Sequence, residues 1–94
     1  MNKEITVWDP SEYLDNDETI LEYLRVTLEE NDPELLTVAL GNIARAKGMT
    51  QLARETGLAR EGLYRALSKG GNPTISTVQK VVAALGYKLS VEIA

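Results

Sequence analysis

The stretch over residues 50–68, TQLARETGLAREGLYRALS, constrains the fold of this chain more than any other. Apolar residues recur at helical spacing on both sides of Gly57, with charged residues between them. Gly57 is expected to end a first helix over 51–56, because the position after a helix often needs a left-handed backbone that glycine adopts without steric cost. A second helix is predicted to start near Ala59 or Arg60. Two short helices joined by such a turn indicate a helix-turn-helix.

The ordered set of Ala53, Gly57, Leu63 and Ala66, followed by the loop GGNP and a helix ending in ALG, resembles Cro/repressor-type helix-turn-helix domains. More narrowly, GMTQLARETGLAREGLYRALSKGGNPTISTVQKVVAALG is similar to the addiction-module antidote family, the HigA-like antitoxins of toxin–antitoxin pairs. The lead-in DPSEYLDNDETILEYL and the stretch DPELLTVALGNIARAKG also match, so the resemblance covers nearly the whole chain. It implies a mainly α, lambda-repressor-like domain. The implied function is an antitoxin that represses its own operon.

The composition indicates one small domain. At 94 residues and 44% hydrophobic content the core is modest, so a homodimer is expected to add stability. The chain has no cysteine, hence no disulfide or thiolate metal site, and no histidine, the commonest general base. An enzyme is therefore disfavoured, and no cofactor is expected. No apolar run could span a bilayer and MNKEITVW lacks a signal-peptide profile, so a cytoplasmic protein is predicted.

The net charge of −4 is unusual for a DNA-binding protein, but it is distributed unevenly. Residues 1–47 carry 4 Lys/Arg and 11 Asp/Glu, whereas residues 48–94 carry 6 and 3. A basic half can meet phosphates, and an acidic half suits solvent or a basic protein. The asymmetry is equally compatible with ordinary solvated faces.

The N-terminal part, residues 1–31, is predicted to be an acidic arm of one strand and one helix. Residues 4–8, EITVW, alternate in the manner of a strand, and Asp15 with Glu18 has the spacing of a capping box. Asp15 and Asp17 lack the glycine turn and closing glutamate of a calcium loop, so no metal is expected. The apolar stripe of the helix is predicted to comprise Ile20, Leu21, Leu24 and Leu28.

Residues 32–86 are predicted to form the helical core. Asp32 as N-cap and Pro33 at the first helical position mark a helix that runs to about Lys47 and stops at Gly48. Its inward residues are expected to be Leu36, Ala39, Leu40 and Ile43.

A last helix is predicted to start at a capping box of Ser76 and Gln79 and to end at Gly86. Its inward positions are Val78, Val81, Val82 and Leu85. Residues 87–94 then alternate apolar and polar side chains, which predicts a half-buried strand. That strand could pair with residues 4–8, with its mate in a dimer, or with the sheet edge of a partner.

The second helix of a helix-turn-helix lies in the major groove with its N-terminal residues toward the bases. Arg60 is predicted to read guanine, through two bonds to O6 and N7. Glu61 could accept from a cytosine amino group or orient Arg60, and Ala59 could contact a thymine methyl. Tyr64 follows on the same side, where it either meets DNA or packs under the loop.

Phosphate contacts are predicted around this reading helix. Thr50, the expected N-cap of the helix over 51–56, and Gln51 would place backbone amides toward a phosphate. Arg65 and Lys69 would add charge. An operator of double-stranded DNA with half-sites about 34 Å apart is expected for a dimer.

Gly62 departs from the resemblance, because the family more often has serine inside the reading helix. Glycine there costs up to about 1 kcal/mol relative to alanine. It could allow close approach to DNA, or leave the helix loose until DNA binds.

The resemblance also implies a cognate toxin, a small and usually basic protein of the RelE/ParE superfamily. Acidic and apolar side chains of residues 15–30 could bind it, although the apolar stripe could equally pack on the protein's own core. The predicted toxin-binding residues are Asp15, Asp17, Glu18, Leu21, Glu22, Leu24, Leu28 and Glu29. The alternative is a stand-alone phage-type transcriptional repressor.

Overall fold

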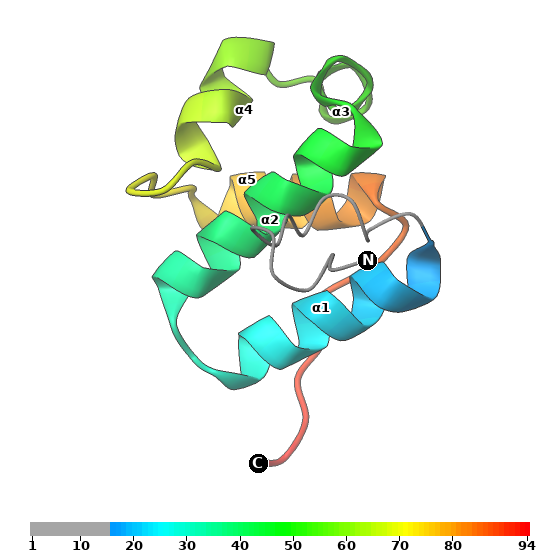
Figure 1. Ribbon diagram of the computed structural model, residues 1–94, viewed down its shortest axis with the longest axis vertical. Coiled ribbons are helices and arrows are strands. Elements are labelled where there is room, and N and C mark those ends of the chain that lie inside the picture. Colours follow the sequence, from blue (N-terminus) through cyan, green and yellow to red (C-terminus); the bar gives the residue numbers. More distant parts are fainter. Residues whose placement is uncertain (1–15) are drawn as a thin grey trace, which may run out of the picture.

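The computed structural model describes residues 16–94 of the chain, and the strand predicted at residues 4–8 lies outside them. The described part is mainly α, as predicted, and contains no strand (Figure 1). Its helices are α1 (Asp17–Glu29), α2 (Pro33–Lys47), α3 (Met49–Thr56), α4 (Arg60–Ala66) and α5 (Ile75–Ala84).

Helix α2 begins and ends where the sequence predicts. The Asp32 carboxylate accepts a hydrogen bond from the Glu34 amide at 3.0 Å, and Pro33 occupies the first turn. Gly48, with a φ of 114°, is the C-cap. Helix α1 packs along α2 as its neighbour in sequence and space (Figure 1).

The N-terminal caps of three helices differ from the predictions. Asn16, not Asp15, caps α1, and its Oδ1 accepts from the Thr19 amide at 2.8 Å. Thr74 caps α5 in place of the predicted Ser76 box, accepting from the Thr77 amide at 3.1 Å. Each segment contains several side chains able to cap, and which one does so depends on where packing starts the helix. Thr50 lies inside α3, which begins one residue earlier.

Burial of Met49 explains the early start of α3. The Met49 side chain is 5% exposed in the core, so Gly48 takes the capping position without a side-chain hydrogen bond. Gly57 ends α3 in the left-handed conformation, with a φ of 76°, and α4 begins at Arg60. The predicted positions of both helices are therefore confirmed to within two residues.

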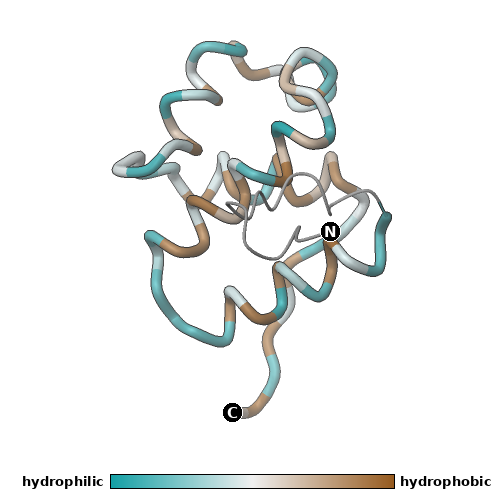
Figure 2. Tube along the Cα trace, in the orientation of Figure 1, coloured by the Kyte–Doolittle hydropathy of each residue, from teal (hydrophilic) through white to brown (hydrophobic). Residues whose placement is uncertain are grey.

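The core is built around α2, and each of the other described helices contributes side chains to the same cluster. Leu40 and Ile43 are fully buried, and α3, α4 and α5 contribute Leu52, Leu63 and Val81. The complete cluster is Ile20, Leu24, Leu40, Ile43, Ala44, Met49, Leu52, Leu63, Leu67, Val78, Val81, Val82 and Leu85. Figure 2 shows how hydrophobic residues, coloured brown, are distributed along the helices.

Two residues of the predicted apolar stripe of α1 lie outside this core. Leu21 and Leu28 are 47% and 42% exposed, whereas Ile20, Leu24 and Thr27 are buried. The buried face of α1 is thus narrower than the predicted stripe. It includes Thr27, whose hydroxyl donates a hydrogen bond to the Tyr23 carbonyl at 2.8 Å.

The strand predicted for residues 87–94 is wrong for the isolated chain. These residues form no regular structure, and no strand in the described part of the chain is available to share their hydrogen bonds. Tyr87 anchors the start of this segment, because its amide donates to the Val82 carbonyl and its hydroxyl to the Asp17 carbonyl, both at 3.0 Å. The segment then leaves the helices at the end opposite α4 (Figure 1).

Candidate functional site

The exposed side of α4 carries an arginine stacked on a tyrosine. The guanidinium carbon of Arg60 lies 5.1 Å from the centre of the Tyr64 ring, one helical turn away. Tyr64 is 40% exposed, so part of its ring reaches the surface beside Arg60. The cation–π contact limits the directions in which the guanidinium can point.

Most of the residues predicted to contact DNA lie on α4 or directly before and after it. Ala59, Glu61 and Arg65 are exposed on or beside α4, and Lys69 is exposed in the turn that follows it. Across residues 49–69 the basic side chains are Arg54, Arg60, Arg65 and Lys69, against Glu55 and Glu61. This end of the molecule is therefore locally basic.

The remaining predicted residues, Thr50 and Gln51, lie in the first turn of α3 and are exposed. The Gln51 amide donates to the Glu55 carboxylate at 3.0 Å, an interaction within α3. This bond uses one of the two N–H groups on Gln51 Nε2, so an anion can bind at Gln51 without breaking it.

Helix α1, the turn after it and the first turn of α2 form an acidic surface. We call it the acidic surface of α1. It consists of Asp17, Glu18, Glu22, Glu29, Glu30, Asp32 and Glu34, all exposed. Arg25 is the basic residue among them, and it pairs with Glu22 at 3.0 Å and with Glu29 at 3.8 Å. The hydrogen bond and charge of Glu22, followed by the charge of Glu29, raise the pKa of Arg25.

Apolar side chains interrupt the acidic surface of α1. Leu21, Val26, Leu28 and Leu35 are between 42% and 48% exposed. Leu24, which was predicted to contact a partner, is 5% exposed and belongs to the core. Asp15, another predicted contact, lies outside the described residues.

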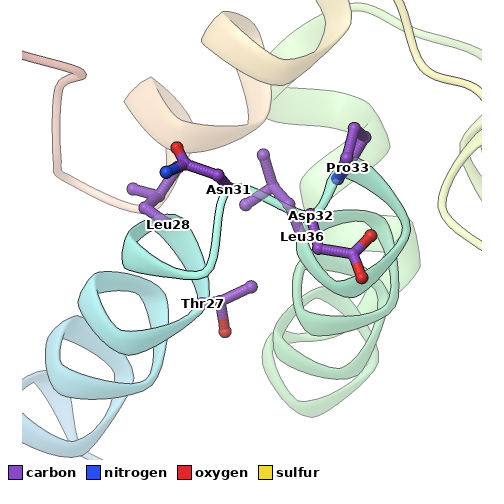
Figure 3. Close-up of a pocket in the computed structure, with 6 residues that line it drawn as sticks. All are labelled: Thr27, Leu28, Asn31, Asp32, Pro33 and Leu36. Carbon is purple, nitrogen blue, oxygen red and sulfur yellow. The ribbon is translucent and has the colours of Figure 1, made fainter.

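A small cavity of about 280 Å³ lies at the turn between α1 and α2 (Figure 3). Its lining comprises Thr27, Leu28, Asn31, Asp32, Pro33 and Leu36. Asn31 adopts a left-handed backbone with a φ of 55°. The sequence predicted the helix start at Asp32 and Pro33, but not the cavity or the exposed Val26 and Leu35. The Asn-Asp-Pro run, in which asparagine tolerates that conformation, was the available signal.

Residues 16–94 contain neither a cluster of metal ligands nor a helix that could span a membrane. No three carboxylates among these residues lie close enough together to hold a metal ion. No helix within this range is long and apolar enough to cross a membrane.

These features define a small helical protein with two different exposed surfaces. One, around α4, is basic, and the other, around α1, is acidic and partly apolar. The chain matches a family model described as "Probable addiction module antidote protein" over residues 4–93. A protein of Haemophilus influenzae described as uncharacterized is 47% identical over 92 residues, covering 98% of this chain and 95% of the relative. No solved structure matches. The chain belongs to the addiction module antidote family.

Proposed function

We propose that this protein is the antitoxin of a type II toxin–antitoxin module, binding operator DNA through α3 and α4 and a small basic toxin through α1. The observation that carries the proposal is the separation of charge between two exposed helices of a chain that belongs to the antidote family. One partner is a polyanion and the other is a cation-rich protein, so opposite surface charges on different elements suit both at once.

In this proposal α3, residues 57–59 and α4 act as a helix-turn-helix, with α4 in the major groove. Arg60 is at the N-terminal end of α4, where such helices contact base edges. The stacked Tyr64 ring restricts the Arg60 side chain before DNA arrives, which lowers the entropy lost on forming two bonds to guanine. Arg65 and Lys69 bind phosphates, and Thr50 and Gln51 meet the backbone at the start of α3.

The DNA part is tested by measuring the affinity of the Arg60→Ala variant for its own upstream DNA and for random DNA. We expect a loss of about 1–3 kcal/mol on the operator and relaxed preference at one base pair, with little change on random DNA. Arg54→Ala is the matched control, since it removes an exposed arginine from α3 instead of α4. An equal loss on both DNAs would make Arg60 a phosphate contact.

Toxin binding is assigned to the acidic surface of α1 with the exposed Leu21, Val26 and Leu28. Acidic groups attract a basic toxin of the RelE/ParE type, and the leucines supply apolar area that excludes water from the contact. The cavity at the α1–α2 turn, open beside Leu28, is a place for one apolar toxin side chain (Figure 3).

Co-expression with the neighbouring genes and a pull-down test this assignment. A small basic protein should co-elute at moderate salt, and Leu28→Ser should weaken its binding. Ile75→Ser is the matched control, because Ile75 is 68% exposed on α5, away from the acidic surface of α1. Point variants are preferable to deletion of α1, since Ile20 and Leu24 are part of the core. If no protein co-elutes but upstream DNA is bound, the phage-type repressor is the better account.

A further inference from the structure

The segment after Tyr87 exposes apolar side chains on alternate residues. Val91 and Ile93 are 97% and 98% exposed, and Leu89 is 37% exposed. Figure 2 shows the alternation along the tube as it leaves the helices. Within residues 16–94, the backbone groups of 88–94 make no hydrogen bond, so both edges of this extended segment present free donors and acceptors.

The sequence of residues 88–92 would let two antiparallel copies of this segment pair opposite charges and apolar side chains with each other. In an antiparallel pair of two copies with its two-fold axis at Ser90, each residue faces the one equally distant on the other side of Ser90. Lys88 then faces Glu92 of the second copy, twice by symmetry, and Leu89 faces Val91. Opposite charges and apolar residues thus meet their counterparts on both sides of the central Ser90–Ser90 position.

The position of the segment leaves room for a second copy. The segment begins at Tyr87, whose hydroxyl and amide hydrogen bonds hold it to the helices. It then runs beside α1, where the charge of Glu92 adds to those of Glu22 and Glu29 in raising the pKa of Arg25. The C-terminus lies at the end of the molecule opposite α4 (Figure 1), so pairing there leaves α4 uncovered.

We propose that residues 88–92 of two copies pair as antiparallel strands about Ser90, and that this contact makes the protein a homodimer. A register shifted by one residue would place Lys88 opposite an apolar residue and break both charge pairs. The charge pairs therefore select the register, and the backbone hydrogen bonds and apolar side chains supply the attraction. This inference does not depend on the proposed function.

Sedimentation equilibrium of the full chain tests the pairing with charge reversals. Lys88→Glu and Glu92→Lys alone should each raise the dimer dissociation constant about tenfold or more, because two attractive pairs become repulsive. The double variant, Lys88→Glu with Glu92→Lys, should restore the wild-type constant. Lys80→Glu on α5 makes the same charge change at an exposed site away from the segment and should have no effect.

Cysteine cross-linking tests the register independently in a chain that has no cysteine of its own. Ser90→Cys should form a disulfide-linked dimer on mild oxidation, since paired residues on antiparallel strands lie about 4.5–5.5 Å apart at Cα. Glu92→Cys should not, because the two copies of that position are offset by four residues, roughly 13 Å. A wild-type chain that stays monomeric, or reversals that the double variant does not rescue, would overturn the proposal and favour pairing with a toxin or within the chain.

Discussion

Replacing Gly62 with alanine is expected to stabilise the protein, because Gly62 occupies an ordinary helical position. It is the third residue of α4, and its φ is not in the left-handed region. A Cβ built on Gly62 would meet only the Cβ of Ala59, at 3.9 Å, which is normal van der Waals contact. Nothing in the surroundings therefore opposes the gain in helix propensity.

The magnitude follows from the entropy that glycine loses on folding. Alanine is better than glycine by about 0.5–1 kcal/mol in a helix, and the new methyl group adds little contact. For a domain of this size, about 1 kcal/mol corresponds to a shift of roughly 4–8 °C in the melting temperature. The expected increase for Gly62→Ala is therefore about 2–8 °C.

Thermal unfolding followed by far-UV circular dichroism measures this shift, and Gly41→Ala provides the contrast. A Cβ at Gly41 would overlap the carbonyl oxygen of Leu67, a backbone atom that cannot move aside cheaply, and it would lie 3.3 Å from the Arg45 guanidinium. Gly41→Ala should therefore lower stability by about 1–3 kcal/mol. The same chemical change would thus have opposite signs at two helical glycines.

An unchanged or lower melting temperature for Gly62→Ala would refute the reasoning. The glycine would then have a role in the fold that its open surroundings do not reveal. DNA affinity gives a separate readout: weaker operator binding by a more stable Gly62→Ala variant would indicate that the missing side chain allows close approach to DNA.

Three further predictions concern a buried core leucine, a helix cap and the titration of a tyrosine. Leu40→Ala should destabilise the protein by about 2–5 kcal/mol in urea unfolding, because Leu40 is fully buried at the centre of the core; a loss below 1 kcal/mol would mean that the core collapses around the cavity. Asp32→Ala should cost about 0.5–2 kcal/mol through the lost cap on α2, and Asp32→Asn should restore most of it. Burial, followed by the charge of Asp17, raises the pKa of Tyr87, so the folded state holds its phenolic proton more tightly than the unfolded state. The stabilisation from this pKa difference is fully present below pH 10.0, the ordinary pKa of tyrosine. It is lost as the pH rises through the raised pKa of Tyr87 in the folded state. Urea unfolding of Tyr87→Phe should therefore show a shallower loss of stability above pH 10.0 than wild type, and identical slopes would contradict the shift.

Local backbone chemistry made several elements predictable from the sequence. Asp32 before Pro33, and Gly57 after α3, act within one turn of the chain, and the structure places them as expected. The valines of α5 follow a helical period and are buried for that reason. The family resemblance rested on the order of residues through the same segments, and the family match covers them.

The candidate site was predictable in its residues but not in their contacts. The sequence placed Arg60 and Tyr64 on one side of a helix, whereas their stacking at 5.1 Å depends on side-chain directions that only the structure provides. Their contact with DNA, and that of the acidic surface of α1 with a toxin, stay predictions.

Choices between equivalent local signals were decided by tertiary structure. Leu21 and Leu28 satisfy the helical period of α1 as well as Leu24 does, yet only the width of the α2 face determines which of them is buried. Burial of Met49 likewise moved the start of α3 ahead of Thr50. For residues 87–94 the sequence determined the alternation of side chains. A strand also needs a neighbour to accept its backbone hydrogen bonds, and the described part of a single chain offers none.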